Sequence, residues 1–260
     1  MKLVCLFSHP RTGTNYLHSV LRQWPGVVAL GEVFHENEAF GLRPAHLAAL
    51  AGPAGRTFSG PADPALVAWV RDNPAKTIAA LARMAHKNGR CALYFKVFPG
   101  QWPNGLGPDL PALARLPGFT PVVLQRRMLD VYVSYCKVAQ IGHYKMADTT
   151  GVPIRLWADA FEIWANESRA WYRQVMSLLE QAGMPPLRAS YEEDIDMAPQ
   201  ALSDHWAGLL GLPGGPVDAA QALTRQDRTP SLENKLDSHG EFVAEAKRLG
   251  VWEIGLGSFF

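Results

Sequence analysis

The chain has 260 residues, of which 48% are hydrophobic and 19% are charged, and its formal net charge is +1. This length suits one large α/β domain with a substantial core, and the composition excludes a disordered tail or scaffold. The balanced charge provides no overall positive field, so we expect no binding of nucleic acid. An anionic ligand would have to be held by a few positioned arginines.

The cysteines and the N-terminus indicate a compartment. Cys5, Cys91 and Cys136 are widely spaced and form no CxxC pair, which favours reduced thiols over a disulfide framework or a zinc site. The apolar run 3–7 is interrupted at residues 10–11, before it reaches the length of a signal peptide or a membrane span. We therefore expect a cytoplasmic protein with no integral membrane segment and no metal.

The chain opens with a strand, a loop and a helix. Leu3–Phe7 is a continuous apolar run of strand length, which is typical of a strand buried on both faces of a parallel sheet. After the loop, apolar residues recur at i, i+3, i+4 and i+7 from Leu17 to Trp24, and the Pro-Gly pair at 25–26 ends this amphipathic helix.

Four further strands are predicted, at Val27–Leu30, Ala92–Phe98, Pro121–Gln125 and Leu187–Tyr191. Helical patterns separate most of them, and such alternation favours a parallel sheet. The sequence therefore predicts an α/β fold, with a parallel β-sheet flanked by helices, in a single domain over residues 1–260.

The segments between these strands differ in character. Residues 38–75 are rich in proline and predict loops and short helices, which we interpret as a lid on the acceptor side; a better helix follows over Ala75–Lys87. Residues 153–181 show a long helical pattern whose aromatic side chains favour core packing over a binding platform. The chain turns polar over 224–240, and a last helix is predicted near Glu241–Arg248.

The loop after the first strand is almost a nucleotide-triphosphate loop. A strand that runs into a glycine turn and a helix gathers backbone N–H groups and the positive helix end around one point. Laid over GxxxxGK[ST], the chain has Ser8, Gly13, Thr14 and Asn15, so the lysine and the magnesium-binding hydroxyl are both absent. A kinase needs both, whereas a phosphosulfate has no γ-phosphate and needs no metal. Arg11 could then stabilise charge on the leaving phosphate. A plain connecting turn is the alternative.

A second candidate anion site follows the strand Pro121–Gln125. Arg126 stands at the carboxyl end of that strand and Ser134 lies in the next predicted helix. Open α/β sheets bind ligands at this edge, where the two side chains could converge on one phosphate. Alternatively, Arg126 and Arg127 are surface charges and Ser134 is an ordinary residue on a helix face.

Together these motifs resemble the family of sulfotransferases that use PAPS (3′-phosphoadenosine 5′-phosphosulfate). Ser8–Tyr16 is similar to the family's 5′-phosphosulfate loop and Arg126–Ser134 to its 3′-phosphate motif. Ser190–Asp194 resembles a segment whose tyrosine lies against adenine, and Leu223–Arg228 resembles the basic loop that closes over the nucleotide. The resemblance implies a P-loop-type fold and transfer of a sulfuryl group from PAPS to a hydroxyl, which leaves PAP.

The same resemblance implies a set of residues that bind the donor. In the first loop these are Pro10, Arg11, Thr12, Gly13, Thr14, Asn15 and Tyr16, with Tyr16 as an aromatic contact to adenine. Farther along the chain they are Arg126, Ser134, Tyr191 and Arg225, the last within a nucleotide-closing loop over 224–240.

The residue that takes the acceptor's proton differs between branches of the family. The branch that acts on phenols and steroids has a Lys-x-His pair on its third strand, but this chain reads Lys96-Val97-Phe98 there. Lys96 could still stabilise charge. The stretch Gly31–Phe34 resembles the Gly-Glu-x-Phe of carbohydrate and bacterial sulfotransferases, so Glu32 is the predicted general base, with His35 and Glu36 as alternatives.

The missing histidine moves the predicted acceptor away from phenols and toward a carbohydrate or a glycolipid. The predicted partners are thus PAPS and a small-molecule or glycan acceptor, and no feature of the sequence predicts an oligomeric state. Two other functions fit parts of the pattern. One is a metal-dependent P-loop kinase with an unusual loop, and the other is a non-catalytic nucleotide-binding module of the same fold.

Overall fold

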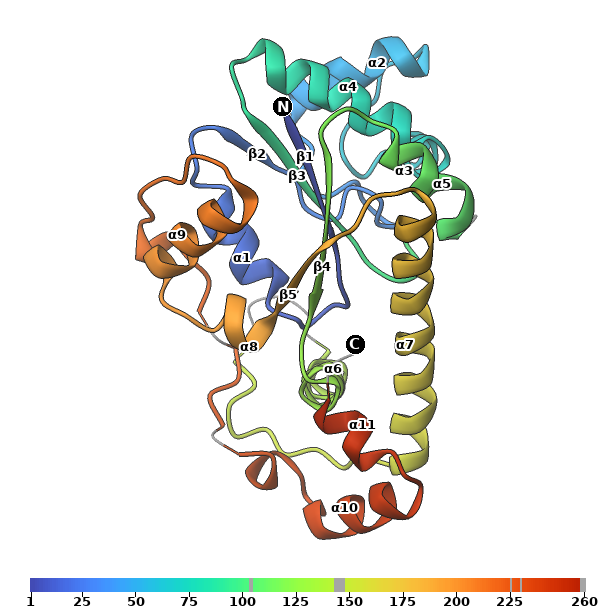
Figure 1. Ribbon diagram of the computed structural model, residues 1–260, viewed down its shortest axis with the longest axis vertical. Helices are drawn as coiled ribbons and strands as arrows, with labels where there is room; N and C mark the ends of the chain where they lie inside the picture. The colour runs from blue at the N-terminus through green and yellow to red at the C-terminus, as the bar shows by residue number, and fades with distance from the viewer. Residues whose placement is uncertain (103–104, 143–147, 225, 230, 258–260) are drawn as a thin grey trace.

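A five-stranded parallel sheet with helices on both faces organises the chain in the computed structural model, which describes residues 1–102, 105–142, 148–224, 226–229 and 231–257 (Figure 1). The strands are β1 (Lys2–Phe7), β2 (Val27–Ala29), β3 (Ala92–Val97), β4 (Phe119–Gln125) and β5 (Leu187–Ser190), in the order β2-β3-β1-β4-β5. Each predicted strand is present within a few residues of its predicted bounds, so the predicted α/β class is confirmed.

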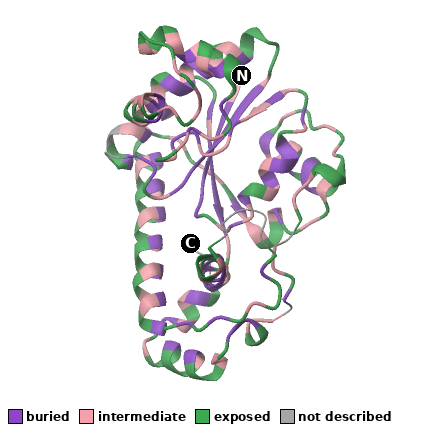
Figure 2. Ribbon diagram, turned by 180° about the vertical axis from the view of Figure 1, so that it is seen from behind, coloured by how far each residue is buried: buried purple, intermediate pink, exposed green. Residues whose placement is uncertain are grey.

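β1 lies at the centre of the sheet because its whole length is apolar. Leu3, Cys5 and Phe7 face one hydrophobic core, and Val4 and Leu6 face the other, as the two-residue alternation of a strand requires. All five are at most 3% exposed, and Figure 2 shows the central strands β1, β3 and β4 as almost continuously buried. β1 pairs with β3 on one side and β4 on the other.

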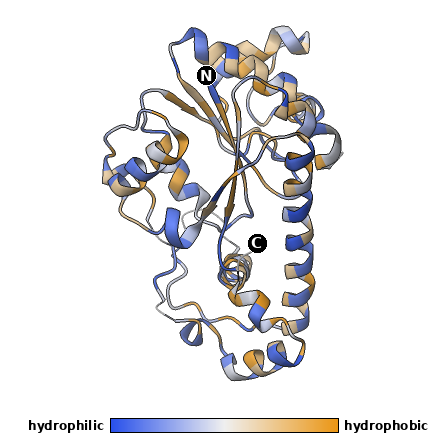
Figure 3. Ribbon diagram, in the orientation of Figure 1, coloured by the Kyte–Doolittle hydropathy of each residue, from blue (hydrophilic) through white to orange (hydrophobic). Residues whose placement is uncertain are grey.

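The two faces of the sheet are covered by different helices. The smaller core lies under α1 (Thr14–Leu21) and α9 (Pro199–Leu210), where the Trp24 indole donates to Ser203 Oγ at 2.8 Å. The larger core lies under α4 (Pro74–Lys87), α5 (Leu106–Ala114) and α7 (Ala158–Gln181). Figure 3 shows hydrophobic and hydrophilic residues alternating along α7, as expected for a helix with one buried face.

Residues 38–75 contain α2 (Pro44–Ala54) and α3 (Pro64–Asp72), as the proline-rich pattern predicts. Both helices pack against α4. Leu50 and Leu66 are completely buried in the larger core. The segment is therefore joined to the body of the domain, and its role as a lid stays a prediction.

The remaining helices are α6 (Met128–Ile141), α8 (Tyr191–Asp194), α10 (His239–Arg248) and α11 (Trp252–Leu256), with 3-10 turns η1 (Ala219–Gln221) and η2 (Glu233–Lys235). In Figure 1, α6, α10 and α11 lie beyond the carboxyl end of β4. None of the helices within the described ranges combines the length and the hydropathy that a bilayer span requires.

The helical pattern that begins at residue 153 is interrupted at its start. α7 begins only at Ala158, because Ile154 instead forms a parallel bridge with Leu236, and its N–H donates to the Lys235 carbonyl at 3.0 Å. Trp157 precedes the helix and is 58% exposed, so it does not join the core. Phe161 and Tyr172 are buried, as predicted for the aromatic residues of this segment.

Candidate active site

The loop between β1 and α1 is tied to the strand beside it. The buried Ser8 hydroxyl donates to the Leu124 carbonyl of β4 at 2.8 Å. The Thr12 hydroxyl donates to the His9 carbonyl at 2.7 Å and closes the turn. These bonds fix the path of the loop before any ligand contributes.

Two residues of this loop have left-handed backbone. Gly13 has φ 82° and precedes α1, and a Cβ there would lie 2.7 Å from the Tyr191 ring and 2.8 Å from Ile195 Cγ2. Arg11 has φ 74° and is the sole non-glycine residue with positive φ in the described part of the chain. Such backbone is uncommon outside glycine and is found preferentially at functional sites.

The first loop and the 3′-phosphate motif meet, although 115 residues separate Arg11 from Arg126. Arg126 Nη1 donates to the Arg11 carbonyl at 3.0 Å, and Arg11 Nε donates to Ser134 Oγ on α6 at 3.1 Å. The Arg126 guanidinium also lies 4.1 Å from the centre of the Tyr191 ring. Four of the predicted donor-binding residues are thus brought to one place, at the carboxyl edge of the sheet.

Positive charge accumulates at this place. Burial lowers the pKa of Arg11, and the nearby charge of Arg126 lowers it further. Arg126 Nε is buried and has no hydrogen-bond partner among the described residues. A buried donor of this kind costs free energy, which an anionic ligand would offset.

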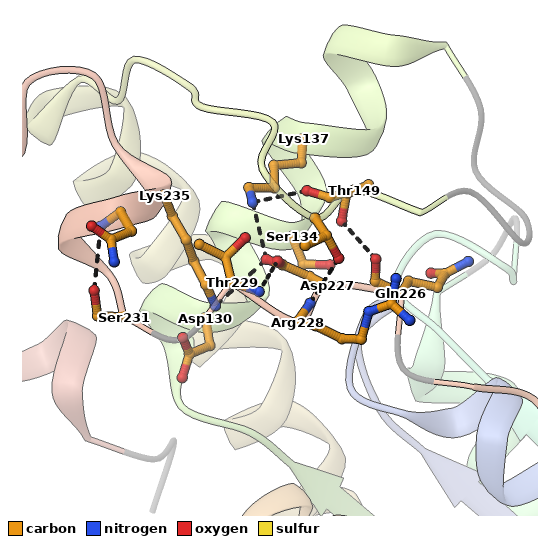
Figure 4. A network of polar contacts seen from close by, with 12 residues as sticks. Asp130, Ser134, Lys137, Thr149, Gln226, Asp227, Arg228, Thr229, Ser231 and Lys235 are labelled. Carbon is orange, nitrogen blue, oxygen red and sulfur yellow. Dashed lines mark hydrogen bonds and ion pairs between the residues drawn. The ribbon is translucent and has the colours of Figure 1, made fainter.

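The segment 224–240 reaches the same arginine. Arg11 donates to the Gln226 side-chain oxygen. The next residue, Asp227, accepts from Lys137 Nζ of α6 at 3.1 Å and lies 3.5 Å from Lys235 Nζ (Figure 4). Lys137 is completely buried, so these contacts join the segment firmly to α6. Arg225, which we predict to bind the donor, lies outside the described residues.

Lys96 and Glu32 lie close together. Lys96 is 2% exposed on β3, and its Nζ lies 3.6 Å from Glu32 Oε1. It also donates to Asn15 Oδ1 at 2.7 Å, which connects the carboxylate to the start of α1. Glu32 Oε2 accepts from Gln101 Nε2 at 3.2 Å.

The alternatives to Glu32 have different surroundings. His35 Nδ1 accepts from the Asn37 N–H at 3.2 Å, and its ring packs against Phe40. Glu36 is exposed. Of the three candidates, Glu32 is the one that contacts Lys96.

The other loop residues have separate places. The Tyr16 hydroxyl donates to the Met197 carbonyl at 2.8 Å; burial raises its pKa, with a smaller contribution from the neighbouring Tyr191. Thr14 is buried in the first turn of α1, and Pro10 is exposed. Among the described residues, His, Cys, Asp and Glu side chains form no cluster of three that could hold a metal ion.

Three aromatic rings surround His9, an arrangement that was not predicted from the sequence. The ring of His9 lies 5.8 Å from Trp164, 5.4 Å from Trp171 and 5.3 Å from Tyr172 between ring centres. The His9 N–H donates to the Tyr172 hydroxyl at 3.1 Å, and this hydroxyl donates to the Leu124 carbonyl at 2.8 Å. The spacing of Trp164, Trp171 and Tyr172 on one face of α7 could have indicated this arrangement, but the same spacing is equally typical of core packing.

Comparisons with known proteins identify the fold of the chain. No model of a protein family and no curated sequence matches the chain significantly. Among solved structures, the sulfotransferase domain from the curacin biosynthetic pathway is similar, with 13% identity over 98% of both chains and a TM-score of 0.51. A sulfotransferase from Alicyclobacillus acidocaldarius has 16% identity over 97% of this chain and 99% of its own, with a TM-score of 0.43. Sulfotransferase STF1 from Mycobacterium tuberculosis has 16% identity over 95% and 75%, with a TM-score of 0.43. The chain therefore has the fold of the curacin-pathway sulfotransferase domain.

We expect Gly13→Ala to destabilise the protein by about 1 kcal/mol or more, because the residue has positive φ and the new methyl would overlap Tyr191 and Ile195. Chemical denaturation would measure the loss. Gly240→Ala is the matched control: Gly240 lies in α10 with open space around its Cβ position. This control should be neutral or stabilising. Equal stability of the two variants would contradict the steric account of Gly13.

We also expect stability to fall on acidification. Burial lowers the pKa of His9 to about 4. The pKa of His18 is also lowered to about 4, and burial is the largest cause. Below about pH 6.5 these histidines bind protons in the unfolded chain but not in the folded protein. The free energy of unfolding should therefore fall between about pH 6.5 and pH 4. For each histidine the fall is at most about 1.4 kcal/mol per pH unit. It should change little between about pH 7 and 8, below the range in which Cys5 and Tyr94 ionise in the unfolded chain.

Urea unfolding at about pH 7, 5.5 and 4.5 would measure this dependence. His9→Phe should reduce the slope, whereas His86→Gln, at an exposed position, should not. A slope that is unchanged in His9→Phe would contradict the assignment.

Proposed function

We propose that the chain is a PAPS-dependent O-sulfotransferase whose acceptor is a carbohydrate or a glycolipid. The observation that carries the proposal is the meeting of Arg11 and Arg126, where Arg126 donates to the Arg11 carbonyl and Arg11 donates to Ser134. Two guanidinium groups beside a loop that opens a helix suit a ligand with two separate anionic groups. PAPS has this pattern, with a 5′-phosphosulfate and a 3′-phosphate.

In this proposal, each part of the donor has its own residues. The loop backbone over 10–15 and Arg11 hold the 5′-phosphosulfate, and Arg126 with Ser134 holds the 3′-phosphate. The Tyr191 ring, already stacked under Arg126, lies beside the adenine together with Tyr16. Asn15 occupies the position at which a P-loop kinase has a metal-binding hydroxyl, and its side chain accepts from Lys96. This supports an anion smaller than a triphosphate.

The transfer step follows from these positions. The acceptor's hydroxyl oxygen bonds to sulfur, the bond between sulfur and the 5′-phosphate oxygen breaks, and PAP departs with the negative charge. The hydroxyl proton moves to Glu32. Arg11 stabilises the leaving phosphate, and Lys96, between Asn15 and Glu32, adds positive charge near the site of transfer.

The acceptor side and the location complete the proposal. A glutamate base replaces the histidine expected for phenols, which favours a carbohydrate hydroxyl, and residues 38–75 close over that acceptor. Residues 224–240, with Arg225, close over the nucleotide. The free thiols of Cys5, Cys91 and Cys136 are consistent with the cytoplasmic location that we propose.

We expect PAP to raise the melting temperature of the protein without added metal, and Arg126→Ala to remove most of this shift. The reason is that the guanidinium would donate directly to the 3′-phosphate. Differential scanning fluorimetry measures the shift. Arg127→Ala is the control, because Arg127 is the neighbouring arginine, is 48% exposed and pairs with Asp130. An equal shift in both variants would remove the 3′-phosphate assignment, and stabilisation by ATP only with Mg²⁺ would favour a kinase.

We expect Glu32→Gln to lower kcat for sulfuryl transfer by about 10²–10⁴-fold, the range found for a lost general base. The amide keeps the shape of the side chain, so the melting-temperature shift by PAP should be retained. The assay uses labelled PAPS against a panel of glycans, glycolipids and phenols. Glu36→Gln, at the exposed neighbouring carboxylate, is the control. Near-normal transfer by Glu32→Gln would redirect the role of base to His35 or Glu36.

A further inference from the structure

Gln101 lies beside the Glu32 carboxylate, and no part of the proposed donor site uses it. It follows β3 and is 6% exposed. Its own backbone is held in place, because its N–H donates to the Phe98 carbonyl at 3.3 Å and its carbonyl accepts from Arg71 Nε at 3.1 Å. A buried glutamine on a fixed backbone has few positions available to its side chain.

The orientation of the Gln101 amide follows from its neighbours. The Phe98 N–H is a donor and lies 3.1 Å from Gln101 Oε1, so this end must be the oxygen. The other end is therefore the NH₂ group, which donates to Glu32 Oε2 at 3.2 Å. The reverse orientation would set N–H against N–H and oxygen against carboxylate, which loses both bonds.

The two carboxylate oxygens of Glu32 thus have different neighbours. Oε2 accepts from Gln101, and Oε1 lies 3.6 Å from the Lys96 ammonium. Tyr94 is a further titratable group near this carboxylate, and the pKa of its buried hydroxyl is raised mainly by burial and secondarily by Cys5 and Glu32. The His18 ring packs against Tyr94. Because the Gln101 amide donates to Oε2 and the Lys96 charge lies beside Oε1, rotation of the carboxylate about its last bond would lengthen a contact. Gln101 and Lys96 together therefore fix the plane of the Glu32 carboxylate.

We propose that Gln101 is a positioning residue for Glu32. Its amide bridges the Phe98 backbone N–H and the Glu32 carboxylate, and so orients that carboxylate toward the acceptor hydroxyl. The proposal rests on the proposed function, in that Glu32 is the general base. Gln101 contacts Glu32, Phe98 and Arg71, none of which we assign to the donor, so loss of Gln101 should change the chemical step and leave donor binding as it is.

Two substitutions separate these roles. Gln101→Glu keeps the shape and the bond from Phe98 but replaces the donor to Glu32 by a second carboxylate. Gln101→Met removes both bonds at similar volume. For both we expect kcat to fall by about 10-fold, as for loss of a hydrogen bond to a charged group. The KM for PAPS and the melting-temperature shift by PAP should not change. In Gln101→Glu the acidic limb of the pH profile of kcat should move to higher pH, because two adjacent carboxylates share a proton.

The chain offers a matched control in Gln200 on α9. Gln200 Oε1 accepts from the Val217 N–H at 2.9 Å and its NH₂ donates to Asp204 Oδ1 at 2.9 Å, which is the same bonding pattern at an exposed position. Gln200→Met should leave kcat and its pH profile unchanged. In a Glu32→Gln background, Gln101→Met should cause no further loss of kcat, because the group that it positions is already gone.

Either of two results would overturn the proposal. One is a full, additive loss of kcat in the Glu32→Gln background, which would mean that Gln101 acts on something else. The other is a crystal structure of Gln101→Met in which the Glu32 carboxylate keeps its place beside Lys96. The crystal structure decides the positioning role whether or not sulfuryl transfer is found, whereas failure of the unsubstituted protein to bind PAP or to transfer a sulfuryl group counts against the proposed function.

Discussion

Two like charges held close together are the constraint on which the site depends. Arg11 and Arg126 would repel each other in isolation, and burial adds a desolvation cost to Arg11. Their arrangement is maintained because Arg126 donates to the Arg11 carbonyl, so the bond that joins them uses backbone and not charge. The left-handed φ of Arg11 turns that carbonyl toward Arg126 at a conformation few non-glycine residues adopt. An anion at this position would relieve the repulsion, and the fold supplies the geometry beforehand.

The sheet order brings the two arginines together. β1 and β4 are neighbours, with Phe7 paired to Val123, so the loop after one strand and Arg126 after the other emerge at the same edge. Parallel strands that are adjacent in space but distant in sequence have this effect at the point where the strand order reverses. The loop then needs support from outside the sheet. Tyr172 gives it by bonding both the His9 N–H and the Leu124 carbonyl, which joins α7, the loop and β4.

The strands and the loop between β1 and α1 could be predicted from sequence because each is local. An apolar run such as Leu3–Phe7 has few alternatives to a buried strand, and a loop between strand and helix has its anion-binding geometry in its own backbone. The contacts of Gln226, His9 and Gln101 could not be predicted in this way. Gln226 meets Arg11 across 215 residues, and His9 meets Tyr172 across 163. Ordinary polar or aromatic residues gain these roles from tertiary packing, and nothing in their immediate sequence distinguishes them.

The same difference separates the two halves of the proposed reaction. The donor half rests on strand register, a turn and a helix start, which bring the side chains of Arg11, Arg126 and Ser134 together. The acceptor half rests on a series of side chains, in which Asn15 accepts from Lys96, Lys96 lies against Glu32, and Gln101 donates to Glu32. This series begins in the donor loop itself. A change that displaces Asn15 therefore displaces Lys96 and then Glu32, so the position of the base is coupled to the loop that would hold the sulfuryl group. For an in-line transfer, which needs hydroxyl, sulfur and leaving oxygen aligned, such coupling keeps the base in register with the donor.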